Sequence, residues 1–171
     1  FNISSVLDEV YSVFGATMST KGIRLTINSD AVTSPDVIGD EISLRKILNN
    51  LLSNANKFTR SGGRVTIFAS QKQMNEKSSI LHLEVADTGV GISEEFIGHL
   101  FEPYTQEMSE NGGRAAGSGL GMAICKSMID LQGGSISVRS RLGEGTTFYV
   151  DIPYSLGKAA VKKTEAVNCS A

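Results

Sequence analysis

The order in which helical and strand patterns of apolar residues follow one another constrains the fold of this chain more than any other feature. Apolar residues recur at helical spacing before Gly22, again from Asp40 to about Thr59, and a third time from Met122 to Leu131. Alternating segments typical of strands lie between and after these helices. They are Ile23 to Ile27, the run Val65, Ile67 and Ala69, the run Leu81, Leu83 and Val85, Ser135 to Ser140, and Thr146 to Ile152.

This order predicts an α/β fold, a two-layer α/β sandwich in which a mixed sheet of about five strands carries about three helices on one face. A tight turn through Gly143 and Gly145 joins the last two strands, so we expect them to pair antiparallel, whereas a helical crossover permits a parallel pair. Irregular connections are expected from Pro35 to Gly39 and from Gln71 to Ser79. A further short helix is expected after Ser93, an N-cap residue that precedes two glutamates.

Length and composition describe one globular domain. With 171 residues, of which 40% are hydrophobic and 20% charged, the chain can bury a core without a disulfide or a metal. We place this domain at residues 1–154 and expect residues 155–171, which lack periodicity, to be a polar linker or tail. Because the first residue is Phe1 rather than methionine, we expect a fragment of a longer protein.

Charge and cysteine usage narrow the classes of function. The net charge of −2 argues against a general binder of nucleic acid or membrane surfaces, so any polyanion must be held by local geometry. Cys125 and Cys169 lack the spacing of a metal site, and reduced thiols are expected. No apolar run is long enough to span a bilayer. We therefore expect a cytoplasmic domain, and whether its parent protein is membrane-anchored stays open.

The sequence is rich in glycine immediately before the third long helix. Five of the ten residues from Gly112 to Gly121 are glycine. Glycine lets a ligand approach the backbone closely, and a helix start offers unpaired N–H groups with partial positive charge, so together they can seat a phosphate. A flexible loop is the commoner explanation of such a run. The stretch from Glu102 to Ser118 shows no period and is long for a loop, which indicates a lid or a disordered segment.

The helix from Asp40 carries polar residues that helix interiors disfavour. Asn50, Asn54 and Lys57 follow at i, i+4 and i+7 and so share one face. Asparagine there costs up to about 0.7 kcal/mol relative to alanine, and a solvated face is the simpler explanation of asparagines alone. The functional interpretation is that the carboxamides hold Mg²⁺, which prefers hard oxygen ligands and takes others from substrate phosphates, while the lysine meets a phosphate.

Three more strings can carry binding chemistry. D-T-G-V-G begins at Asp87, at the end of a strand, where the carboxylate can accept an exocyclic amine and the glycines let a flat ring approach. Taken alone, G-E-G-T-T from Gly143 is most simply a turn between strands. Likewise, F-E-P-Y from Phe101 is most simply core or hinge packing.

Five strings follow one another along the chain: N-N-L-L-S-N-A-N-K-F-T, D-T-G-V-G-I, F-E-P-Y, G-S-G-L-G and G-E-G-T-T-F. In this order they resemble the asparagine box, the first glycine box, the phenylalanine box and the second and third glycine boxes of two-component sensor histidine kinases. The chain thus resembles the catalytic and ATP-binding domain of these kinases, a GHKL-type domain with the Bergerat fold. Type II topoisomerase, chaperone and mismatch-repair ATPases belong to the same superfamily. The resemblance covers about Phe1 to Tyr154, and the ordered set of five boxes is highly specific.

The resemblance implies roles for individual residues around one Mg·ATP. Asn54, helped by Asn50, would bind Mg²⁺, Lys57 would contact phosphate, and Asp87 would accept the adenine amino group. Asn54 and Lys57 are the catalytic residues that it implies. The other implied contacts to the nucleotide are Phe58 beside the adenine, Gly89, Gly91 and Ile92 around the pocket, Gly117, Gly119, Leu120 and Gly121 toward the phosphates, Thr146 in the network around Asp87, and Arg114 of the lid.

The implied activity is transfer of the γ-phosphoryl group of ATP to a histidine, for relay to an aspartate of a response regulator receiver domain. His82 and His99 lack the family's acceptor motif. We therefore expect the acceptor in a dimerisation and phosphoacceptor domain upstream of Phe1, through which the parent protein would form a homodimer. The segment from Glu102 to Ser118 would be an ATP lid. Alone, this fragment should bind Mg·ATP and autophosphorylate poorly or not at all.

Some positions depart from the family's pattern. Ser43 and Lys46 stand where members often have Arg and Gln, so which basic side chain of this helix, Arg45, Lys46 or Lys57, assists the phosphates stays open. Asn56 occupies a position that is usually apolar or small, and we assign it no role.

Two alternatives come from other classes of function. An ATP-binding switch or scaffold module without kinase output would share every nucleotide contact. A topoisomerase-like or chaperone-like ATPase is disfavoured, because such enzymes need a carboxylate that activates water near the asparagine box. Glu41 is the only acid of that helix after Asp40, and it is far from Asn54 in sequence.

Overall fold

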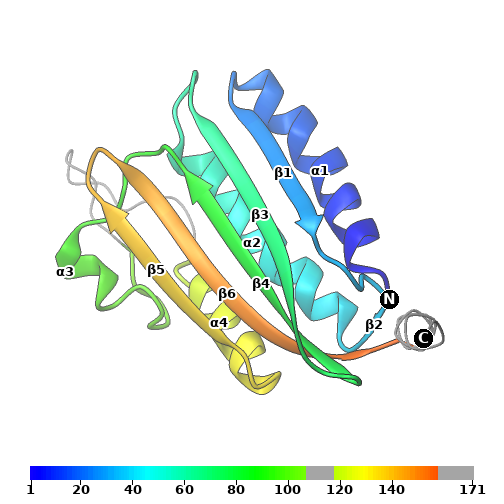
Figure 1. The fold of residues 1–171 in the computed structure, drawn as a ribbon. Helices are drawn as coiled ribbons and strands as arrows, with labels where there is room; N and C mark the ends of the chain where they lie inside the picture. Colours follow the sequence, from blue (N-terminus) through cyan, green and yellow to red (C-terminus); the bar gives the residue numbers. More distant parts are fainter. Residues whose placement is uncertain (107–117, 158–171) are drawn as a thin grey trace.

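A computed structural model describes residues 1–106 and 118–157 of the chain, and within them helices and strands form two layers (Figure 1). No helix in these two ranges is long and apolar enough to cross a membrane. In chain order the elements are α1 (Ile3–Thr20), β1 (Arg24–Ala31), β2 (Val37–Ile38), α2 (Glu41–Phe58), β3 (Arg64–Asn75), β4 (Ser78–Asp87), α3 (Glu94–Ile97), α4 (Gly121–Leu131), β5 (Ser135–Arg141) and β6 (Gly145–Leu156).

The strands form one mixed sheet in the order β1-β3-β4-β6-β2, and β5 pairs with β6 as well. β1 and β3 are parallel, as the α2 crossover between them permits, and every other neighbouring pair is antiparallel. The expected antiparallel pairing of the last two strands is confirmed, with Val138 opposite Phe148. The predicted α/β two-layer sandwich is therefore confirmed.

The sheet has six strands rather than about five, and its last strand, β6, extends beyond the end of the domain predicted from the sequence. The additional strand is β2, in the segment expected to be an irregular connection, where Val37 pairs with Leu156. Two residues are too few to show a period. β6 accordingly runs two residues past Tyr154, where we ended the domain. The tail expected at residues 155–171 falls outside the described residues from 158 onward.

The loop expected from Gln71 to Ser79 is wrong. β3 and β4 continue through it as a long hairpin, in which Lys72 lies opposite Ile80, and they leave only Glu76 and Lys77 between them. Near this end β3 is exposed on both sides, so polar residues stand at successive positions and the two-residue alternation disappears.

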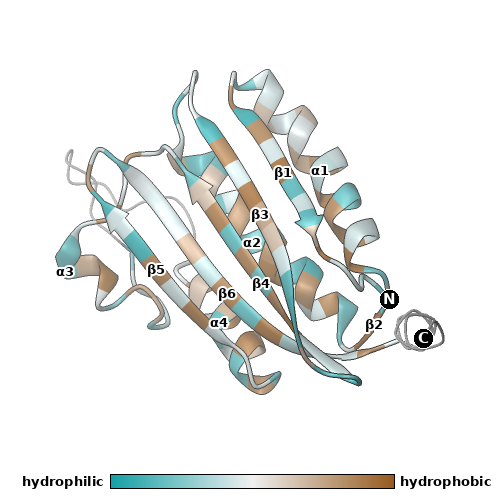
Figure 2. Ribbon diagram, in the orientation of Figure 1, coloured by the Kyte–Doolittle hydropathy of each residue, from teal (hydrophilic) through white to brown (hydrophobic). Residues whose placement is uncertain are grey.

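Three long helices, α1, α2 and α4, lie on one face of the sheet, whereas the four-residue α3 stands apart beside β5 (Figure 1). Apolar and polar residues alternate along β3 and β4 (Figure 2), so that the apolar set faces the helices. The core between the layers is continuous. Its largest fully buried side chains are Ile3, Leu7, Met18, Leu44, Ile47, Leu48, Leu51, Leu52, Ile67, Leu81, Leu83 and Ile129.

Side-chain caps fix where the helices begin. Asp40 accepts hydrogen bonds from the backbone N–H and the hydroxyl of Ser43, at 3.0 and 2.6 Å, and these bonds lower the pKa of Asp40. Asn2 caps α1 and Ser93 caps α3 in the same way. The start of α2, and with it the position of every residue on its polar face, is therefore set by Asp40.

Candidate functional site

The polar face of α2 lies against the start of α4. Asn54 is half-buried, and its Nδ2 donates to Sδ of Met122 at 3.2 Å. Asn50 lies beside the first residue of α4, because a Cβ on Gly121 would be 3.4 Å from the Asn50 Oδ1. The two sequence features expected to share one ligand, the asparagine face and the glycine-rich helix start, are thus adjacent.

Asp87 ends β4 as a half-buried carboxylate fixed by backbone donors. The N–H of Gly89 donates to its Oδ1 at 2.8 Å, and the backbone N–H of Thr146, its register partner on β6, donates as well. Burial raises the pKa of Asp87 although these two hydrogen bonds act to lower it. Among the described residues no cation pairs with this carboxylate. It can therefore accept a hydrogen bond from a ligand.

Two glycines allow close backbone approaches around Asp87. Gly145 has φ of +100°, and a Cβ there would lie 2.0 Å from the carbonyl oxygen of Asp87. Gly91 has φ of +73°, and a Cβ there would lie 2.0 Å from the carbonyl oxygen of Arg141. Only glycine combines such dihedrals with such contacts. These glycines bring the turn after β4 and the turn between β5 and β6 together as one corner.

A partly buried hydroxyl network holds this corner, and the residue at its centre, Ser140, was not predicted from the sequence. Its Oγ hydrogen-bonds the hydroxyl of Thr146 at 2.8 Å, donates to the carbonyl oxygen of Gly145 at 2.8 Å, and accepts from the N–H of Ile92 at 2.8 Å. Only the register of β5 on β6 places Ser140 there, and no motif around this serine indicates a role.

The end of α2 is joined to the same corner. The N–H of Val90 donates to the carbonyl oxygen of Phe58 at 3.2 Å. The Phe58 ring, at the end of the helix expected from the apolar spacing, is 37% exposed instead of buried in the core. The Lys57 ammonium lies 4.8 Å from the centre of this ring. Asp87 is therefore held close to the end of α2, one helical turn from Asn54.

Lys21 is a second residue that the sequence analysis left without a role. Its ammonium donates to the carbonyl oxygens of Asn56 and Lys57, the latter at 3.4 Å, at the C-terminus of α2. A cation there satisfies terminal carbonyls and complements the helix dipole. Nothing in the structure gives the Asn56 side chain a function.

In the described part of the glycine-rich segment, Gly119 lies against the backbone of the phenylalanine-box segment. Tyr104 has φ of +63°, and its N–H donates to the carbonyl oxygen of Gly119 at 3.0 Å. Leu120 is the N-cap residue of α4, and its N–H donates to the hydroxyl of Ser118 at 3.3 Å. Two of the expected nucleotide contacts, Arg114 and Gly117, and most of the expected lid lie outside the described residues.

Both histidines have acidic neighbours. His99 lies 3.0 Å from a carboxylate oxygen of Glu102. His82 lies between Asp151, at 2.6 Å, and Glu84, at 3.2 Å. Burial alone would lower the pKa of His82, but hydrogen bonds to the two carboxylates outweigh it and raise the pKa.

The donor set of α2 fits a hard divalent cation. In the described ranges no group of three His, Cys, Asp or Glu side chains could hold a metal. The Nδ2 of Asn54 is engaged with Met122, which leaves its Oδ1 as the atom that can face a ligand. A carboxamide oxygen suits Mg²⁺, provided that a bound phosphate supplies the negative charge.

Comparison with known proteins connects this geometry with one family. Residues 39–156 match the family model described as histidine kinase-, DNA gyrase B- and HSP90-like ATPase. The chain is 35% identical over 164 residues to the autoinducer 2 sensor kinase/phosphatase LuxQ of Vibrio vulnificus strain CMCP6, an alignment that covers 96% of this chain and 19% of LuxQ. It spans about a fifth of the length of such curated relatives.

Solved structures give the same result for the fold. Full-length ShkA in complex with AMPPNP aligns with a TM-score of 0.77 at 29% identity, over 94% of this chain and 32% of ShkA. Histidine kinase ThkA in complex with the response regulator protein TrrA aligns with a TM-score of 0.68 at 25% identity, over 90% of this chain and 40% of that chain.

Proposed function

The chain belongs to the family of histidine kinase-, DNA gyrase B- and HSP90-like ATPases, and we propose that it is the catalytic, ATP-binding domain of a sensor histidine kinase. It would transfer the γ-phosphoryl group of ATP to a histidine in a separate dimerisation domain, for relay to a response regulator. The observation that carries the proposal is the placement of the half-buried Asp87 carboxylate beside the end of α2, whose face presents Asn50 and Asn54 to the start of α4.

In this proposal the two ends of the nucleotide are recognised by different chemistry. The Asp87 carboxylate accepts the adenine amino group, and the Thr146 and Gly89 N–H groups keep its oxygens in place. Gly91 and Ile92 follow in the same turn and would line the base, with the exposed Phe58 ring beside it. Because the acceptor is preoriented, little free energy is lost in ordering it.

The triphosphate would lie between the asparagine face of α2 and the start of α4. The backbone N–H groups of Gly119 and Gly121 would face the phosphates, as would that of Leu120 after it exchanges the Ser118 hydroxyl for a phosphate oxygen. Asn54 and Asn50 would hold Mg²⁺. The cation would neutralise charge on the transferred group, which is most of what catalysis of phosphoryl transfer requires. Lys57 would leave its place over the Phe58 ring to reach a phosphate oxygen.

Three matches support kinase output over the alternative of an ATP-dependent switch or scaffold. LuxQ is named a sensor kinase/phosphatase, ShkA was solved with AMPPNP, and ThkA was solved with a response regulator. His82 and His99 are already engaged by carboxylates. The acceptor histidine would therefore lie in another part of the parent protein, which we expect to be homodimeric through that part.

Nucleotide binding is tested by titrating the chain with a fluorescent ATP analogue in Mg²⁺ buffer. Asn54→Ala and Asp87→Asn should each weaken binding by about tenfold or more, since each removes a hydrogen bond or ligand to a charged partner. Glu84→Gln is the matched control, because Glu84 lies on β4 but on the opposite face of the sheet. Affinity like that of the wild type in both site variants would refute the site.

Kinase output is tested on the intact parent protein with ATP labelled on the γ-phosphate. The expected result is acid-labile, base-stable phosphate on the protein, absent from the Asn54→Ala variant. Nucleotide binding without any label on the protein would instead establish the switch or scaffold.

A further inference from the structure

The open face of the sheet carries two arginines side by side at one end. Arg24 on β1 and Arg64 on β3 are register partners, both exposed and both on the face away from the helices. Neighbouring strands lie about 4.8 Å apart, so two like charges directly opposite each other destabilise the pair. In the part of the chain that the structure describes, neither guanidinium forms an ion pair.

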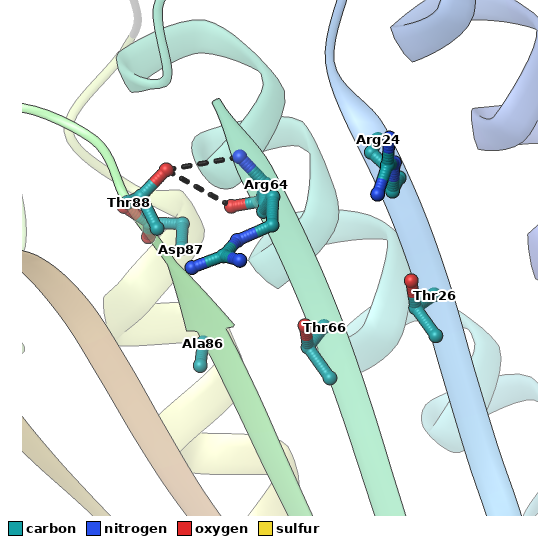
Figure 3. A pocket seen from close by; sticks show the side chains of 7 residues that line it. All are labelled: Arg24, Thr26, Arg64, Thr66, Ala86, Asp87 and Thr88. Carbon is teal, nitrogen blue, oxygen red and sulfur yellow. Dashed lines mark hydrogen bonds between the residues drawn. The ribbon is translucent and has the colours of Figure 1, made fainter. Parts of the chain in front are cut away.

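The residues around the arginines are short and form the floor of a hollow. Thr26 and Thr66, the next outward-facing register pair, lie beside Arg24 and Arg64, and Ala86 is the partner of Thr66 on β4 (Figure 3). Together with Asp87 and Thr88, these residues line a hollow of about 450 Å³. A second hollow of about 480 Å³ shares both arginines and continues over the glycines of the adjoining turns.

Thr88 fixes Arg64 at the rim of this hollow. Its hydroxyl accepts from the backbone N–H of Arg64 at 2.9 Å (Figure 3). The preceding Asp87 carboxylate is held by the N–H groups of Gly89 and Thr146, toward the face that the helices cover. Asp87 also lines the hollow (Figure 3), so the hollow and the nucleotide site meet at this residue. Among the described residues its carboxylate forms no ion pair with either arginine.

We propose that this hollow, the Arg24–Arg64 site, binds a phosphate group carried by a small molecule or present as the free ion. A phosphate brings the negative charge that two adjacent guanidiniums lack, and its oxygens point in enough directions to meet both. The Thr26 and Thr66 hydroxyls on the floor can donate to the remaining oxygens. The site shares Asp87 with the proposed nucleotide site but no residue of the asparagine face or of the start of α4, so its test can be read separately from nucleotide binding.

The test is a titration of the chain with inorganic phosphate at constant ionic strength, followed by NMR of backbone amides and of the arginine Nε–Hε groups. Saturable shifts are expected at Arg24, Arg64 and Thr66. Arg24→Gln and Arg64→Gln should each weaken binding by about tenfold, which corresponds to one charged hydrogen bond. Lys72→Gln is the matched control, because Lys72 is an exposed cation on the same face of β3 outside the hollow and should bind phosphate like the wild type.

A parallel titration with glycerol 3-phosphate distinguishes the sources of the phosphate group. Binding of both compounds assigns the site to the group itself, binding of the ester alone assigns it to a phosphorylated small molecule, and binding of the ion alone assigns it to free phosphate. Shifts that do not saturate, that are equal in all variants, or that are confined to α2 and the start of α4 would overturn the proposal.

Discussion

Charged and titratable side chains along β4 are held in different ways on the two faces of the sheet. On the face covered by helices, the Asp87 carboxylate is held by backbone N–H groups, which cannot titrate or move away. On the open face, His82 is held by the side chains of Asp151 and Glu84. These carboxylates can titrate, and they can also move away from the imidazole. Backbone contacts build a rigid acceptor suited to one ligand geometry, whereas side-chain contacts respond to pH. We therefore expect substitutions at the corner around Asp87 to have larger effects than substitutions on the open face.

The largest loss of stability is expected when a side chain is added at Gly145, where the backbone lies against the Asp87 carbonyl oxygen. Gly145→Ala adds a Cβ that would lie 2.0 Å from the Asp87 carbonyl oxygen, at a positive φ, and we expect it to cost about 3 kcal/mol of stability. Gly143→Ala is the matched control in the same turn, because Gly143 also has positive φ but nothing lies within 4 Å of its Cβ position. It should cost about 1 kcal/mol. Urea denaturation measures both, and equal costs would show that the close approach is unimportant.

A smaller effect is expected from Ser140→Ala, which removes the centre of the hydroxyl network. The Ile92 N–H and the Gly145 carbonyl lose a partner, so we expect a loss of about 1 to 2 kcal/mol in the free energy of unfolding. Ser137→Ala, at an outward-facing position of β5, serves as the control. If both variants unfold at the same urea concentration as the wild type, the network does not hold the corner.

Asp87→Asn should raise the melting temperature slightly while it weakens nucleotide binding. Burial raises the pKa of Asp87 in the folded protein. The carboxyl group therefore contributes fully to the free energy of unfolding below its pKa in the unfolded chain, about 4, and this contribution is lost as the pH rises through its pKa in the folded protein. At neutral pH the ionised carboxylate therefore costs stability that asparagine avoids. Melting temperatures of both proteins at pH 4 and pH 7 test this, with a gain expected only at pH 7. A lower melting temperature for Asp87→Asn at pH 7 than for the wild type contradicts the sign.

The smallest effect is expected on the open face, from His82→Gln. Carboxylate contacts raise the pKa of His82, so its contribution to stability is present below the unfolded pKa of about 6.5 and disappears as pH rises through the folded pKa. Thermal melts from pH 5.5 to 8.5 should show a gap between wild type and variant that closes with rising pH. Asp151 and Glu84 face the imidazole, with Tyr149 stacked on it. A gap that is constant over this range would mean that packing on Tyr149, and not charge, explains the effect.

Much of this fold follows from the sequence because its elements have strong periods or caps. The helix that Asp40 begins repeats apolar residues at helical spacing for its whole length, and the core stripe from Leu44 to Ala55 is buried as expected. β2 and the far half of the β3–β4 hairpin could not be predicted, since backbone pairing alone makes them strands. β2 has too few residues to show a period, and the side chains in the far half of the hairpin are exposed on both sides and so show no alternation.

Only those residues of the candidate site that belong to a recognisable sequence motif could be predicted. Asn54 and Asp87 belong to such motifs, and the structure brings the elements that carry them together. Ser140, through its hydroxyl, contacts Ile92, and Lys21, through its ammonium, contacts Asn56, both distant in sequence. Such contacts depend on strand register and helix ends, which a single sequence does not reveal. Arg24 and Arg64 likewise become neighbours only through the parallel pairing of β1 with β3.

Recognition of the adenine by Asp87 is tested most directly by calorimetry that compares ATP with inosine triphosphate, in the wild type and in Asp87→Asn. Inosine triphosphate carries an oxygen where adenine carries the amino group. If Asp87 accepts that amino group, the wild type should bind ATP at least about tenfold more tightly. Asparagine can donate to the oxygen, so the variant should prefer inosine triphosphate. An unchanged preference for ATP in the variant would contradict this role of Asp87, because the base would then be recognised elsewhere.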